Sequence, residues 1–204
     1  MAGWGAMMSS PDRNRRADAL RSRAAILDAA IQVLDATPDA GLSAVAAAAG
    51  VTRPTVYAHF PSRERLLQAV TERLTEESVA AMDAVDLDTG PAAEALIRML
   101  DAGSRVTARH PGLVRLIAAQ PVAAEADHAR HSPVADRIRR AVLRGRQAGE
   151  FDDRLPVDWV VSATIALGHA ASEERETGRL TAPAAQDSLR ASLLRLLGAD
   201  SAAE

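Results

Sequence analysis

The fold of this chain is decided by residues 41–67, GLSAVAAAAGVTRPTVYAHFPSRERLL. Val45 and Ala46 lie on one apolar face of a short predicted helix. Gly50 follows it, where a left-handed backbone can end a helix because glycine lacks a Cβ atom. Thr52 is placed to cap a second short helix, since its hydroxyl can accept a first-turn backbone N–H. The stretch therefore begins with two short helices separated by a tight turn.

The second short helix has clear signals at both ends. Pro54 lies in its first turn, where a missing N–H costs no hydrogen bond. Val56 and Phe60 are four residues apart and share the buried side of the helix. Pro61 disfavours helical geometry at the residue before it, and Ser62 can cap a third helix. The pattern predicts a short helix that is held rigidly between its neighbours.

The side of this helix that faces away from the core is polar. Arg53, Thr55, Tyr57 and His59 fall there. A helix of fewer than ten residues is not stable alone in water, so this helix must be held by packing against its neighbours. We expect that this packing serves to display the polar face. Such a face suits a groove lined with hydrogen-bond acceptors and phosphates. This is the arrangement of a helix-turn-helix motif.

The composition fits an all-α globular protein. The chain has 204 residues, of which 48% are hydrophobic and 2% aromatic, so the core must be rich in alanine and leucine. The net charge of −3 means that positive charge for nucleic acid must be local. The absence of cysteine excludes disulfides and cysteine-ligated metals. We find no signal peptide and no apolar run long enough to span a bilayer, which predicts a cytoplasmic protein without membrane contact.

Three regions are predicted. Residues 1–17 form a disordered arm, with Met1, Met7 or Met8 as the possible start; residues 18–75 form a helix-turn-helix domain; residues 76–204 form a helical bundle. The basic residues near the arm could contact DNA phosphates or form a solvated tail. These residues are Arg13, Arg15, Arg16, Arg21 and Arg23. The predicted buried stripes of the domain are Ile26, Leu27, Ala30, Ile31 and Leu34, and Leu66, Leu67, Val70 and Leu74.

The bundle is predicted from apolar residues at helical spacing. Helices are expected at 91–109, 113–120, 133–149, 157–176 and 183–197, with a polar connection at 125–132, for about nine helices in the chain. The last two helices have apolar faces wider than one neighbour requires. In the first of them, that face comprises Trp159, Val160, Ala163, Leu167 and Ala170. We therefore expect a homodimer through the last two helices.

Residues 26–70 resemble the DNA-binding domain of the tetracycline-repressor (TetR) family of transcriptional regulators. The resemblance is carried by Ala29-Ala30, Val45-Ala46, Ala49-Gly50-Val51-Thr52, Thr55-Val56-Tyr57, His59-Phe60, Ser62-Arg63-Glu64 and Leu66-Leu67. It implies a repressor that binds double-stranded DNA at a palindromic operator as a homodimer. The DNA-binding residues that we expect are Ser43, Thr52, Arg53, Pro54, Thr55, Tyr57, Ala58, His59 and Arg63. Arg53 is the candidate for a guanine contact, since its guanidinium matches guanine O6 and N7.

The resemblance also implies a pocket for a small-molecule effector in the middle helices. The expected lining is Leu96, Met99, Leu100, Leu116, Ile117, Val142, Trp159 and Ala163. The effector itself is unknown, and no cofactor is expected. Effector binding would change the spacing of the two DNA-binding heads and so weaken DNA affinity.

Two alternatives remain at this stage. A metal-dependent protein would need convergent polar groups, and the one candidate cluster is Glu125, Asp127, His128 and His131. His128 and His131 have the spacing of two metal ligands on one helix face, but they fall in a predicted loop. A helical protein-interaction module would explain the last two helices but not the exposed polar face of residues 53–59. We therefore expect no enzymatic activity.

Overall fold

The computed structural model describes residues 10–120 and 124–199, with side chains for 14–120 and 131–199. Within these ranges the chain forms nine helices and no strand, which confirms the predicted all-α fold. The chain divides into two units: unit 1 runs up to Thr71 and includes Gly112–Ala119, and unit 2 contains Glu72–Pro111 and the chain from Gln120 onward. Residues 1–9 of the predicted arm, with the three possible start methionines, lie outside the described residues.

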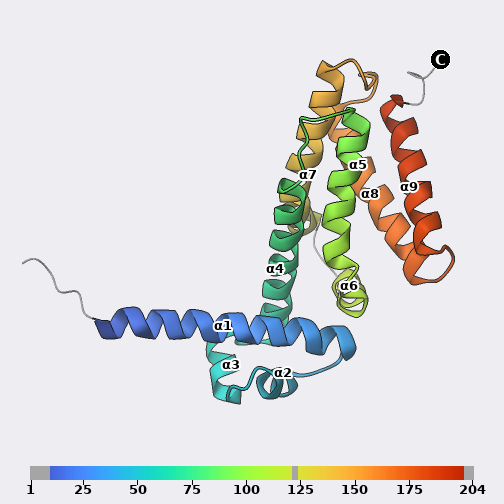
Figure 1. Ribbon diagram of the computed structural model, residues 1–204. Coiled ribbons are helices and arrows are strands. Elements are labelled where there is room, and N and C mark those ends of the chain that lie inside the picture. The colour runs from blue at the N-terminus through green and yellow to red at the C-terminus, as the bar shows by residue number, and fades with distance from the viewer. Residues whose placement is uncertain (1–9, 121–123, 200–204) are drawn as a thin grey trace, which may run out of the picture. The chain divides into compact units, whose positions relative to one another are not determined.

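Unit 1 contains α1 (Ser10–Ala36), α2 (Leu42–Ala48), α3 (Arg53–His59), the first part of α4 (Arg63–Asp83) and nearly all of α6 (Pro111–Ala118). Figure 1 shows α2 and α3 lying along one side of α1. The predicted stripes on α1 and α4 are buried, as are Val45, Val56 and Phe60. The short helices α2 and α3 are therefore stabilised by their packing and not by their own length.

The first helix begins earlier than the sequence predicted. We expected a disordered arm to residue 17 and a helix from about residue 18, but α1 begins at Ser10. Pro11 lies in its first turn, a position that proline favours because its φ angle is already helical. The following residues are mostly good helix formers, so the helix extends outward from the packed turns that begin at Ile26.

Unit 1 also includes a helix from the middle of the chain. The N–H of Leu113 donates to Asp35 Oδ1 at 3.0 Å, and Leu113 is fully buried. Gly112 lies so close to the backbone of α1 that a Cβ atom there would be 2.1 Å from the carbonyl oxygen of Asp35. The predicted boundary after residue 75 separated residues 112–119 from this unit; the hydrogen bond and the close approach place them in it.

Unit 2 contains the second part of α4 with α5 (Ala92–Thr107), α7 (Ala124–Gln147), α8 (Val157–Glu176) and α9 (Ala182–Leu197). α7 packs against α5 and α8, and α8 packs against α9. Figure 1 shows α8 and α9 as antiparallel neighbours. Their bounds agree with the predicted helices 157–176 and 183–197. The core of the unit is formed by Met82, Ala92, Leu96, Met99, Ile138, Ala141, Val142, Phe151, Val160, Val161 and Leu197.

The predicted polar connection at 125–132 is wrong. α7 begins at Ala124 and continues through Pro133, which lies inside the helix. Proline removes one N–H from the helical ladder, but it does not forbid helical geometry on both sides when neighbours support it. Alanine, glutamate and arginine dominate residues 124–130 and favour helix.

The apolar face predicted on α8 is only partly buried within the single chain. Trp159 is 60% exposed and Ala170 is exposed, whereas the helix buries Val160, Val161 and Thr164. Ala163 and Leu167 are half-buried. The helix is thus rotated so that the tryptophan faces away from the core of its own unit. None of the described helices is long and apolar enough to cross a membrane.

Candidate nucleic-acid interface

The helix α3 is held at both ends by the interactions that its sequence predicted. Gly50 has a φ angle of 65°, in the left-handed region, where the turn between α2 and α3 requires glycine. The hydroxyl of Thr52 accepts a hydrogen bond from the Thr55 N–H at 3.4 Å, which caps the helix. Val56 and Phe60 are 0% and 3% exposed and fix the inner side of the helix. The packing of the inner side therefore holds α3 rigidly, and its outer side remains exposed.

Arg53 and Tyr57 form one connected polar surface on the outer side of α3. An Nη2 N–H of Arg53 donates to the Tyr57 hydroxyl at 3.3 Å, and the guanidinium carbon lies 5.5 Å from the centre of the tyrosine ring. Both residues are exposed, Tyr57 by 41%. The contact holds the arginine extended over an aromatic face without burying its remaining N–H groups. These groups are available for an acceptor outside the protein.

The other predicted contact residues on or beside α3 differ in accessibility. Pro54 and Ala58 are exposed, whereas Thr55 is half-buried and its Oγ1 lies 2.8 Å from Thr52 Oγ1. His59 is half-buried, with its ring centre 6.3 Å from that of Phe60. Ser43 is exposed at the start of α2. The structure thus brings Arg53, Tyr57 and the small residues of α3 to the surface, and it ties Thr55 partly into the cap.

Arg63 has a different environment from the one predicted. We expected its guanidinium to contact a phosphate, but in the structure it donates to the carbonyl oxygen of Pro38 and, at 3.5 Å, to that of Ala40. These carbonyls belong to the turn between α1 and α2. The arginine therefore braces that turn from the first residue of α4. A sequence pattern alone did not indicate this, because the two segments are more than twenty residues apart.

The start of α4 is capped as predicted. The Ser62 hydroxyl accepts the Arg65 N–H at 3.3 Å. Hydrogen bonds from the side chain of Ser62 and from the backbone of Glu64 hold the pKa of the Glu64 carboxyl below its ordinary value of 4.5. A carboxylate in the first turn also suits the positive end of the helix dipole. The end of α3 at His59 and the start of α4 at Arg63 are thus fixed within four residues of each other.

The predicted effector lining is divided between the two units. Leu96, Met99 and Val142 are fully buried in the core of unit 2, with Leu100 packed against them. Leu116 and Ile117 belong to unit 1, Trp159 is exposed, and Ala163 is half-buried. Leu96, Met99 and Val142 fill a packed core and do not line an open space.

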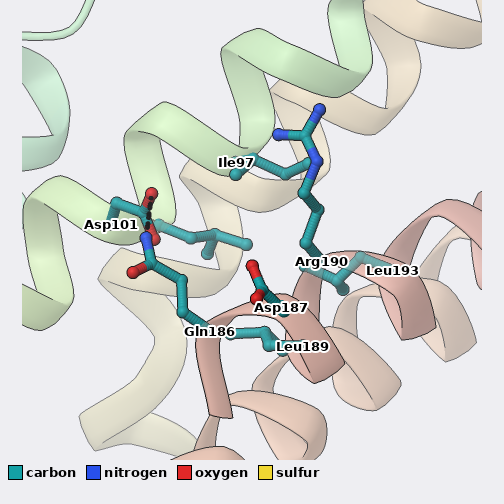
Figure 2. A pocket seen from close by; sticks show the side chains of 8 residues that line it. Ile97, Asp101, Gln186, Asp187, Leu189, Arg190 and Leu193 are labelled. Atoms are coloured by element: carbon teal, nitrogen blue, oxygen red, sulfur yellow. Dashed lines mark hydrogen bonds between the residues drawn. The ribbon is translucent and has the colours of Figure 1, made fainter. Parts of the chain in front are cut away.

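A pocket of about 320 Å³ lies between α5 and α9 in unit 2. Figure 2 shows aliphatic and charged side chains from both helices around it, with the Asp187 carboxylate between them. Gln186 Nε2 donates to Asp101 Oδ2 at 2.9 Å and joins the two helices at one side of the pocket. The lining residues are Ile97, Leu100, Asp101, Gln186, Asp187, Leu189, Arg190 and Leu193. Leu100 is the one residue that this lining shares with the predicted effector lining.

The predicted metal-ligand pair is only partly described. Glu125, Asp127 and His128 belong to α7, but their side chains lie outside the described residues. His131 is half-buried, and its ring centre lies 5.0 Å from that of His169 on α8. Among the side chains that the structure describes, no group of three or more metal-ligating residues is found.

Comparison with known proteins places the helix-turn-helix residues in one family. Residues 26–70 match the model of the bacterial regulatory proteins, tetR family. Over 81 residues the chain is 44% identical to the transcriptional repressor LfrR of Mycolicibacterium smegmatis, and over 60 residues 47% identical to the uncharacterized regulator TtgW of Pseudomonas putida. These matches cover 40% and 28% of this chain but only 43% and 45% of those proteins' lengths.

Similarity to solved structures extends over most of the chain. The structure of LfrR from Mycobacterium smegmatis in complex with proflavine is 28% identical, with a TM-score of 0.61, over 85% of this chain and 95% of that one. The structure of RolR with resorcinol is 23% identical, with a TM-score of 0.69, over 91% and 92% of the two chains. The second comparison concerns the fold alone, since the identity is low.

Proposed function

We propose that this chain is a sequence-specific transcriptional regulator, because its residues 26–70 match the model of the bacterial regulatory proteins, tetR family. We propose further that it acts in the cytoplasm as a repressor, binding a palindromic operator as a homodimer and leaving it when an effector binds. The main support for this proposal is the rigid, exposed face of α3, on which Tyr57 supports Arg53. The family is one of regulators, so we propose no catalytic activity.

In this proposal α3 enters the major groove of DNA. Arg53 donates two hydrogen bonds to a guanine, whose O6 and N7 match the guanidinium geometry. Tyr57 releases or shares its contact with Arg53 and donates its hydroxyl to a phosphate, while Ser43 and His59 contact the flanking backbone. Ala58, Pro54 and Thr55 set how closely the helix approaches the bases. The structure of α3 supports this proposal, because its exposed side carries these groups and its inner side is fixed.

Binding to DNA from the protein's own promoter region tests the proposal. Fluorescence anisotropy should show tighter binding to a fragment of that region than to a shuffled duplex of equal length. Arg53→Ala should lose about 1–3 kcal/mol of binding free energy and relax the preference at one base pair. Arg105→Ala removes an exposed arginine from α5, in the other unit, and is the matched control. Full affinity and preference in Arg53→Ala would refute the role of that residue.

For the effector we propose the pocket between α5 and α9. Its volume of about 320 Å³ is at the lower end of small-molecule sites. Aliphatic residues on both helices can cover an apolar ring, and the carboxylates of Asp101 and Asp187 can accept hydrogen bonds from a positively charged group. We therefore propose a small, flat molecule that carries a cationic or strongly donating group. The relative LfrR has been solved with proflavine, which is a planar aromatic cation of this class.

Proflavine itself is the probe for this site. Quenching of its fluorescence should report binding to the wild-type protein, and Asp187→Asn should weaken that binding at least several-fold. Asp136→Asn, which removes an exposed carboxylate from α7, is the matched control. Proflavine should also release the protein from promoter DNA in the anisotropy assay. Equal affinity of the Asp187→Asn variant would place any proflavine site elsewhere.

A further inference from the structure

The N-terminal part of α1 extends beyond the core of unit 1. Burial in α1 begins at Ile26, whereas the described residues before it, from 14 to 25, are exposed apart from the half-buried Ala17 and Ser22. From Ser10 to residue 25 this part of the helix has a length of roughly 24 Å at 1.5 Å per residue. A helical segment that buries so little apolar surface gains little stability from packing.

This segment carries positive charge in a protein with an overall net charge of −3. From residue 10 to residue 25 the sequence has five arginines and two aspartates, Asp12 and Asp18. Asp18 is an ion-pair partner of Arg21 on the same helix, so the charge of Arg21 is locally balanced. The five arginines of the segment therefore outnumber its two acidic residues, and its net charge is positive.

One arginine shows which side of α1 is close to the DNA-binding helix. The guanidinium of Arg23 lies over the ring of Phe60, 5.3 Å from its centre, and Phe60 is the residue that directly follows α3. Arg16 is seven residues before Arg23 and so lies only about 20° away around the helix. Arg21 lies about 140° from Arg16 on another face. Arg16 and Arg23 therefore lie on the same face of α1, with Arg16 farther from the end of α3 than Arg23 is.

We propose that this basic face of α1, formed by Arg16 and Arg23, binds the phosphate backbone of DNA outside the base pairs read by α3. We infer DNA as the partner for two reasons: its phosphates complement the charge of the arginines, and this face is continuous with the end of α3. The inference rests on the proposed function, since it concerns a second contact with the same DNA. Each phosphate contact releases a counterion and adds about 0.9 to the slope of log affinity against log salt.

The test uses two duplexes with the same operator, one ending at the edge of the α3 footprint and one extended by about ten base pairs on each side. Anisotropy titrations from 50 to 200 mM salt give the slope for each duplex. Wild type should have the steeper slope on the extended duplex. Arg16→Ala should lower that slope by about 0.9 for each bound head, so that the fourfold rise in salt weakens binding roughly 3.5-fold less per head.

Arg21→Ala is the matched control, because it removes the same charge from the same exposed helix on a different face. An unchanged slope in Arg16→Ala, or an equal loss in Arg16→Ala and Arg21→Ala, would overturn the proposal. A change of oligomeric state in Arg16→Ala, measured by sedimentation, would also overturn it by showing that a second copy covers this face. Failure of wild type to prefer the operator duplex would instead refute the proposed function.

Discussion

Asp83, at the end of α4, accepts two hydrogen bonds from the guanidinium of Arg137 on α7: 3.0 Å from Nε and 2.6 Å from Nη2. Arg140 Nη2 lies 3.7 Å from the same carboxylate. This paired geometry is the strongest form of an arginine–carboxylate contact. It joins the last turn of α4 to the middle of α7 within unit 2. The contact therefore fixes the last turn of α4 against α7.

Replacing this carboxylate should change the acid stability of the protein. The hydrogen bond from Arg137 lowers the pKa of Asp83 from its ordinary value of 3.8. A lowered pKa means that the stabilisation is present above pH 3.8 and is lost as the pH falls through the folded-state pKa. The contribution should be at most about 1 kcal/mol, since the carboxylate is partly solvated. Asp83→Asn should therefore lower the Tm at pH 7 by a few degrees and have a smaller effect at pH 3.

Thermal unfolding followed by circular dichroism from pH 7 to pH 3 measures this difference. Asp153→Asn, which neutralises an exposed carboxylate in the loop after Phe151, is the control for the change of net charge. A loss of Tm in Asp83→Asn that stays constant over the whole pH range would contradict the assignment.

Most of the α1–α4 helical pattern could be predicted because its signals are local. The cap at Thr52, the left-handed Gly50 and the buried pair Val56 and Phe60 each depend on residues within one or two turns. The contacts of Arg63 with the carbonyls of Pro38 and Ala40 could not be predicted, because the fold alone brings these residues close. Local sequence patterns predicted both ends of α3, but they do not determine which distant acceptor a long side chain reaches.

Substitution of Gly112 should destabilise unit 1. A Cβ atom at this position would lie 2.1 Å from the carbonyl oxygen of Asp35, a backbone atom that cannot move without displacing α1. Gly112→Ala should cost about 1–3 kcal/mol through this overpacking. Gly168→Ala, on α8, meets no atom within 4 Å and should be neutral or stabilising, because alanine favours helix. Chemical denaturation of the two variants compares them directly; equal stability would show that α6 does not approach α1 so closely.

The hydroxyl of Thr52 should contribute to the stability of the free protein, in addition to any contact with DNA. It accepts the Thr55 N–H at 3.4 Å and contacts Thr55 Oγ1 at 2.8 Å. Thr52→Ala should cost about 1 kcal/mol by leaving a helix N–H without its cap, whereas Thr52→Ser retains the hydroxyl and should stay within a few tenths of wild type. Urea unfolding measures both. If the alanine and serine variants were equally stable, the cap would contribute nothing.

The second unit was harder to predict, because its helices are apolar on several sides. The spacing on α8 fits Trp159, Ala163, Leu167 and Ala170 as well as it fits the face that is buried, with Val160 common to both. Which side faces the core depends on neighbours that are distant in sequence. The pocket between α5 and α9 was missed for the same reason, since Leu100 and Leu189 are far apart in the chain. Periodicity identifies a helix but not its rotation.

The exposed side of α8 leads to the last prediction, which concerns the proposed homodimer. Trp159 is 60% exposed, and the next positions on its side of the helix, Ser162, Ala166 and Ala170, are small and exposed. Small residues around one large aromatic allow two helices to approach closely and bury the tryptophan. Ala166→Arg should therefore convert the dimer to monomer in sedimentation equilibrium. Ala148→Arg, at an exposed alanine just after α7, should leave it dimeric.

The same variants separate dimerisation from DNA reading. A monomer offers one recognition helix where the proposed operator has two half-sites, so Ala166→Arg should lose most of its operator affinity while retaining helical content. The loss should be much smaller for a duplex that contains a single half-site, because only one head can bind there in either form. A variant that stays dimeric, or that becomes monomeric and still binds the full operator as tightly as wild type, would contradict the use of the α8 face in this way.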